Sequence, residues 1–108
     1  MMGENDGLAS IIYQCNQTPN DVSPEIWQRC LNYYFIQYNG WEYMYYQNID
    51  GSIPSQLWVG ADALYREQMN LNQAYARLWA EYQVGFDEPF KSYVSELFVV
   101  RSQSAPQD

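Results

Sequence analysis

Residues 26–47 read IWQRCLNYYFIQYNGWEYMYYQ, and the conformation of this stretch decides the fold. Two interpretations compete for it. Large side chains recur from Trp27 to Tyr45 at alternating spacings of four and three residues, which is the period of a helix. However, Tyr, Trp and Phe favour strands, and Asn39-Gly40 is a strong signal for a hairpin turn.

A hairpin requires polar and apolar residues to alternate along both arms. The segments 33–36 (YYFI) and 43–46 (YMYY) are instead solid apolar blocks. We therefore predict one long helix over about 24–48, in which Gly40 costs about 1 kcal/mol and admits a bend or a close neighbour. The residues Ser23-Pro24-Glu25 favour this start, because Ser caps a helix and Pro suits its first turn.

Apolar residues at helical spacing predict four further helices, over about 6–16, 54–69, 73–84 and 88–100. The helix over 54–69 carries Leu57, Ala61, Leu64 and Gln68 on one line, with Trp58, Tyr65 and Met69 beside it. Asn72 is expected to cap the helix over 73–84, and Asp87-Glu88-Pro89 to open the helix over 88–100. The sequence thus predicts an all-α fold, a small bundle of five helices in a single domain over 1–101, with a disordered tail over 102–108.

Composition and charge exclude several classes of protein. The 108 residues are 47% hydrophobic and only 17% charged, which excludes an intrinsically disordered chain. Five Lys and Arg against thirteen Asp and Glu give a net charge of -8, so we expect no nucleic-acid partner. No apolar run approaches 18 residues and the N-terminus does not resemble a signal peptide. We therefore expect no direct membrane insertion and a cytoplasmic location.

The residue types that most enzymes use are scarce. The chain has no His, which removes the commonest general base and metal ligand, and no Ser lies in a Gly-x-Ser-x-Gly setting. Glu42 with Glu81, or Asp87 with Glu88, has no metal-binding spacing, and helix capping explains Asp87 and Glu88. We expect no catalytic residues, no metal, no cofactor and no enzyme activity.

Two cysteines, Cys15 and Cys30, are too few for a disulfide-rich scaffold. Their spacing fits no zinc site without His. The first interpretation is two buried free thiols. A bridge across a helical hairpin stays open as the alternative.

Loose aromatic motifs extend from about residue 8 to residue 97. They are Trp41-Glu42-Tyr43-x-Tyr45-Tyr46-Gln47, Gly51-x-Ile53, Leu57-Trp58, Arg77-x-Trp79, Phe86 and Phe90-x-x-Tyr93-Val94. In these motifs the chain resembles a family of uncharacterised bacterial proteins in which a membrane-spanning segment precedes a small cytoplasmic helical domain. The resemblance implies an all-helical fold, supports a helix over 24–48, and implies no established activity. This sequence lacks the membrane segment, which puts membrane tethering in doubt.

Glu42 is the most informative charged residue, because it falls among aromatic side chains on the long helix. A carboxylate in such surroundings needs a partner or a raised pKa. We predict a structural ion pair with Arg77. The alternative is a general acid or base in an aromatic pocket.

The surplus of aromatic residues favours an interaction surface, since Tyr and Trp anchor interfaces and so small a domain cannot readily bury them all. We expect a helical self-association or protein-interaction domain, at least a dimer through the first or second helix. The alternative is a small-ligand or effector-sensing domain with an aromatic-lined pocket between helices. The residues expected at the interface or pocket are Tyr38, Trp41, Tyr45, Tyr46, Trp58 and Trp79.

Overall fold

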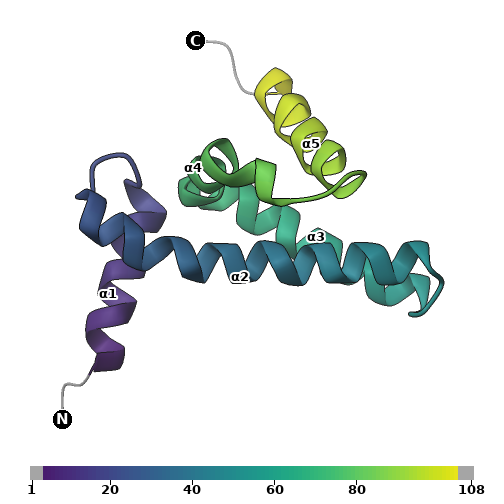
Figure 1. Cartoon of the computed structure of the whole chain (residues 1–108), viewed down its shortest axis with the longest axis horizontal. Coiled ribbons are helices and arrows are strands. Elements are labelled where there is room, and N and C mark those ends of the chain that lie inside the picture. The colour runs from purple at the N-terminus through teal and green to yellow at the C-terminus, as the bar shows by residue number, and fades with distance from the viewer. Residues whose placement is uncertain (1–3, 105–108) are drawn as a thin grey trace.

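The computed structural model describes residues 4–104, and it confirms the all-α fold with one long central helix (Figure 1). Within this part of the chain there are five α-helices, one short 3-10 helix and no strand. The elements are α1 (Glu4–Gln17), α2 (Pro24–Ile49), α3 (Ser55–Leu71), α4 (Gln73–Tyr82), η1 (Gln83–Gly85) and α5 (Phe90–Ser104).

The 26 residues of α2 make one uninterrupted helix, about 39 Å long at 1.5 Å per residue. The side chain of Ser23 caps its start, accepting a hydrogen bond of 3.1 Å from the backbone N–H of Ile26. Gly51, with φ of 73°, follows its end in a conformation that glycine adopts without strain. Periodicity therefore outweighed the strand preference of the aromatic residues, and Asn39-Gly40 lies inside the helix.

The other helices pack around α2 (Figure 1). α1 crosses its N-terminal end, α3 runs back beside its C-terminal half, and α4 and α5 cover one side of it. The arrangement is flattened, with principal extents of 44 × 41 × 24 Å. No helix in the described part of the chain combines the length and apolarity that a membrane crossing requires.

Aromatic rings fill the centre of the core. The ring of Tyr38 on α2 lies 5.1 Å from that of Trp79 on α4, and 5.8 Å from that of Phe86 after η1. The hydroxyl of Tyr38 donates to the carbonyl oxygen of Tyr75 at 2.9 Å, so its polar group is satisfied although the side chain is fully buried. The core therefore holds Tyr and Trp in quantity without leaving their donors unpaired.

One line of α3 faces this core and another faces outward. Asp62 and Met69 are buried, and Trp58 and Tyr65 pack against the core. Leu57 and Leu64, on the line named first in the sequence pattern, are exposed. The aromatic side chains of α3, and not its leucines, therefore face the interior.

Several predicted boundaries are wrong by a few residues. α5 begins at Phe90 and continues to Ser104, so residues 102–104 are helical and not part of a disordered tail; residues 105–108 lie outside the described residues. Asn72 precedes α4 but makes no side-chain cap. Its amide donates instead to the Oε1 of Gln68 at 2.8 Å.

Candidate functional site

The predicted ion pair between Glu42 and Arg77 is not present. Arg77 pairs with Glu81, one turn along α4, with a distance of 2.8 Å from Nε to Oε2. Glu42 takes part in none of the ion pairs seen among the described residues. Spacing along the sequence placed Arg77 opposite the wrong part of α2, since it lies at the Trp27 end of that helix.

The carboxyl group of Glu42 has a raised pKa, which was the second possibility for a carboxylate among aromatic side chains. Partial burial raises the pKa of its carboxyl above the ordinary value, and the charge of nearby Asp87 acts in the same direction. The backbone N–H of Asp87 opposes the shift without cancelling it. Glu42 is therefore a carboxyl group held at some cost when it is charged.

Arg77 holds the loop between α1 and α2 against α4. Its guanidinium carbon lies 4.3 Å from the centre of the Trp27 ring, and its Nη1 donates to the carbonyl oxygen of Pro19 at 2.5 Å. Glu81 completes the group by accepting from the indole Nε1 of Trp27 at 2.8 Å. Partial burial disfavours the charge on Glu81, but the hydrogen bonds from Arg77 and Trp27 outweigh it and hold the pKa of Glu81 below its ordinary value. These contacts describe a structural clamp with its polar groups already occupied.

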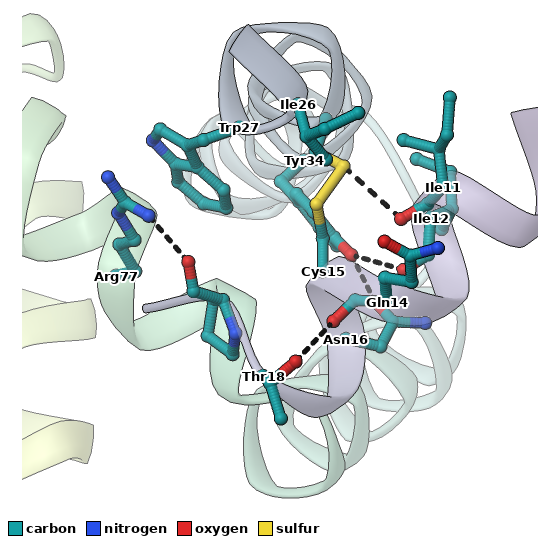
Figure 2. Close-up of a disulfide and its surroundings, with 12 residues drawn as sticks. Ile11, Ile12, Gln14, Cys15, Asn16, Thr18, Ile26, Trp27, Tyr34 and Arg77 are labelled. Atoms are coloured by element: carbon teal, nitrogen blue, oxygen red, sulfur yellow. Dashed lines mark hydrogen bonds between the residues drawn. A yellow bond between two sulfur atoms is a disulfide. The ribbon is translucent and has the colours of Figure 1, made fainter. Parts of the chain in front are cut away.

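The disulfide between Cys15 and Cys30 overturns the expectation of free thiols (Figure 2). The bond joins the end of α1 to the second turn of α2, and both cysteines are fully buried. Next to it, the hydroxyl of Tyr34 donates to the carbonyl oxygen of Ile12 at 3.3 Å and to the side chain of Asn16. Because α1 crosses α2 beside Cys30, the two cysteines lie close enough to bond, as the helical-hairpin alternative required.

A buried carboxylate that the sequence analysis missed lies on α3. The Oδ1 of Asp62 accepts from the Nε1 of Trp41 at 3.0 Å and from the hydroxyl of Tyr93 at 2.7 Å. Its Oδ2 lies 3.5 Å from Arg66. Burial and the bond to Asp62 raise the pKa of Tyr93 above its ordinary value. A signal existed in the sequence, because Asp62 falls four residues after Trp58 and three before Tyr65, on the line that faces the core.

This cluster links three helices, α2, α3 and α5, through one side chain. Both oxygens of Asp62 have partners, and no buried side-chain donor or acceptor in the described part of the chain lacks one. The arrangement is that of a satisfied structural network.

The six aromatic residues expected at an interface or pocket divide into two groups. Tyr38, Trp41 and Trp79 are buried in the core. Tyr45, Tyr46 and Trp58 are half-buried and pack against it. Tyr46 also binds the start of α5. Its hydroxyl donates to the carbonyl oxygen of Asp87 and accepts from the N–H of Phe90, both at 3.3 Å.

Two hollows among the described residues have other linings. One, of about 430 Å³, is a mainly apolar groove between α1 and the Tyr33 side chain of α2, lined also by Leu8, Ala9, Ile12, Tyr13 and Asn16. The other, of about 530 Å³, lies over α4 and is lined by Asn20, Gln73, Ala76, Arg77, Ala80, Glu81 and Arg101. None of the six predicted aromatic residues lines either hollow.

Side chains that could hold a metal ion do not gather anywhere in residues 4–104: no group of three His, Cys, Asp or Glu is present there. Asp87 and Glu88 precede α5, as capping predicts. The Oε1 of Glu88 accepts from the backbone N–H of Ser92 at 3.1 Å and from its hydroxyl at 2.5 Å.

Large apolar side chains are exposed on α1, α2, α3, η1 and α5, and two groups of them share a groove or a helix face. The first is the groove just described, where Leu8, Tyr13 and Tyr33 remain accessible. The second is the outward line of α3, where Leu57, Leu64 and Leu71 are 53%, 57% and 66% exposed.

No family model, curated protein or solved structure matches the chain.

Proposed function

We propose that this chain is a non-catalytic helical domain for self-association or protein interaction. The observation that carries the proposal is the exposure of large apolar side chains on α1 and α3, two helices whose other faces are already packed. A small domain that exposes apolar groups in rows and grooves gains free energy by covering them. The polar clusters around Asp62 and Arg77 supply no competing site, because their partners lie within the chain.

The alternative, a small-ligand or effector-sensing domain, needs a hollow between helices lined by aromatic rings. Here those rings contact one another. The ring centres of Tyr38 and Trp41 lie 6.0 Å apart, and those of Tyr45 and Tyr93 lie 5.1 Å apart. We therefore favour the interaction domain. The resemblance to the membrane-anchored bacterial family stays a prediction and adds no activity to either alternative.

Sedimentation equilibrium over a hundredfold range of concentration tests self-association. We expect the average mass to rise from that of the monomer toward that of a dimer. A monomer mass at every concentration would contradict the self-association half of the proposal. A second series in 1 M NaCl separates apolar association, which persists, from charge pairing, which salt screens.

The expected cytoplasmic location conflicts with the disulfide. Buried structural disulfides persist in oxidising compartments and are rare in the reducing cytosol. We propose that the protein resides in an oxidising compartment. Rapid acid quenching of the cells that make it, followed by a maleimide that adds mass to each thiol, tests this: an unmodified chain is expected, and a chain with two added groups would contradict it.

A further inference from the structure

We propose that the hollow over α4 binds the carboxylate group of a small organic acid, with Arg101 as the residue that holds it. The hollow has a volume of about 530 Å³, within the range of roughly 300 to 1,000 Å³ that is usual for small-molecule sites. It is not the aromatic-lined pocket of the alternative function. The inference goes beyond the proposed interaction domain and stands whether or not the chain self-associates.

Three parts of the chain line this hollow (Figure 1). Asn20 comes from the loop between α1 and α2, Arg101 from the last turn of α5, and the other residues from one face of α4. On that face Ala76 and Ala80 lie one turn apart. Their small side chains leave room above the helix, so α4 forms the floor of the hollow.

Arg101 carries a positive charge that no carboxylate neutralises directly, since it takes part in none of the ion pairs seen among the described residues. Its Nη1 donates to the carbonyl oxygen of Met69 at 3.0 Å, and its guanidinium carbon lies 5.8 Å from the centre of the Phe98 ring. These contacts hold the guanidinium in place. An Arg side chain has further N–H groups, and their planar arrangement matches the two oxygens of a carboxylate.

Arg77 and Glu81, which also line the hollow, neutralise each other. The Nε of Arg77 lies 2.8 Å from the Oε2 of Glu81, and the other oxygen of Glu81 accepts from Trp27. The lining therefore has two cations against one carboxylate. Its local charge is positive, although the chain as a whole has a net charge of -8.

The start of α4 adds to this positive potential. Gln73, the first residue of α4, lines the hollow. No acidic side chain lies in the first turn and Asn72 makes no side-chain cap, so no side chain compensates the positive end of the helix dipole. The amides of Gln73 and Asn20 can also donate to an oxygen atom. The lining thus offers charged and neutral donors to one anion.

Charge and shape select the kind of anion. A net charge of -8 repels an acidic protein over a long range, and a small monoanion is repelled much less. One uncompensated guanidinium matches a single carboxylate better than a phosphate group, whose charge is about -1.5 to -2. The methyl groups of Ala76 and Ala80 can contact an apolar part of the ligand. A small organic acid meets all of these conditions.

Titration with sodium propionate tests the site, with the ionic strength held constant by NaCl. NMR signals of the side-chain amides of Asn20 and Gln73 and of the Nε–H of Arg101 should shift and saturate. Binding in the millimolar range is expected, because propionate has few atoms. Shifts that do not saturate, or that NaCl alone reproduces, would overturn the inference. Tighter binding of inorganic phosphate than of propionate would overturn the assignment to a carboxylate.

Three variants test the role of Arg101. Arg101→Met should weaken propionate binding at least about tenfold, because it removes a charged donor. The control Arg29→Met removes the same charge from an exposed position on α2 and should leave binding unchanged. Because Arg101→Met also loses the bond to Met69, Ala80→Glu provides an independent test: it adds a carboxylate to the hollow, leaves Arg101 in place and should also block binding.

Melting curves establish that all three variants are folded. Equal affinity for propionate in Arg101→Met and Arg29→Met would overturn the inference. Equal affinity in Ala80→Glu and the wild type would place the ligand outside the hollow and would overturn it as well. None of these outcomes bears on self-association, which sedimentation equilibrium measures separately.

Discussion

The hydroxyl oxygen of Tyr65 on α3 lies 2.7 Å from the position that a Cβ atom on Gly40 of α2 would occupy. The ring of the same tyrosine stacks on Trp41, with ring centres 5.6 Å apart and planes inclined by 13°. Gly40 therefore lets α3 approach α2 where the aromatic core begins. The same residue type at Gly60 has open space around it, which makes the two glycines a matched pair.

We expect Gly40→Ala to lower the melting temperature and Gly60→Ala to raise that of the monomer. Alanine in a helix gains about 0.5 to 1 kcal/mol over glycine at either position. At Gly40, overpacking against Tyr65 costs about 1 to 3 kcal/mol and exceeds that gain. Thermal unfolding at a concentration where the chain is monomeric measures both.

Adding Tyr65→Phe to Gly40→Ala provides the control. It removes the hydroxyl, and the next atom of the ring lies 3.7 Å away, at ordinary contact distance. The double variant should recover stability relative to Gly40→Ala. If it does not, the hydroxyl is not the obstacle.

Removing the disulfide should lower the free energy of unfolding by about 3 kcal/mol, because it closes a loop of 15 residues. The double variant Cys15→Ala with Cys30→Ala keeps small apolar groups in both buried positions. Its melting temperature should match that of the reduced wild type and should not respond to reductant. A wild type that is unaffected by reductant would contradict the bond.

Glu42→Gln should leave the protein as stable as the wild type or more so at pH 7. Burial raises the pKa of Glu42 above its ordinary value, so the folded state favours the protonated form. That stability is present below the ordinary pKa and is lost as pH rises through the raised one. The advantage of Gln should therefore grow from pH 3 to pH 7, as melting curves at several pH values can measure.

Arg77→Met is the companion to Glu42→Gln. It should cost about 1 to 3 kcal/mol, since it removes the hydrogen bond to Pro19 and the contact with Trp27. Combining it with Glu42→Gln should show additive effects. A loss of 3 to 5 kcal/mol in Glu42→Gln alone would instead indicate a broken buried pair.

Asp62→Leu should destabilise the protein more than any of these single changes, by about 3 to 5 kcal/mol. It leaves the indole N–H of Trp41 and the hydroxyl of Tyr93 without an acceptor, at about 1 to 3 kcal/mol each. Asp62→Asn keeps one acceptor oxygen and should cost less. Urea unfolding of both variants measures the difference, and equal losses would mean that the charge of the carboxylate, and not one acceptor oxygen, matters at this position.

The sequence alone determined the helices, because their signals are local. The four-and-three spacing from Trp27 to Tyr45 and the capping by Ser23 involve residues within a turn or two of one another. These signals identified the all-α fold and the long central helix. At Gly40 they left a bend and a close neighbour open, and the structure shows the close neighbour, Tyr65. They located the ends of α4 and α5 less well, by two to four residues.

Only the tertiary structure decided which side chains meet. The partner of Arg77, the bond between Cys15 and Cys30, and the burial of Asp62 all depend on how α1, α3 and α4 lie against α2. Each joins residues whose approach is set by the rotation and crossing of whole helices, and a helical period is the same whichever neighbour a face meets. For the same reason the helical period could not decide whether Leu64 or Tyr65 faces the core. Only packing placed Tyr65 against the core and left Leu64 exposed.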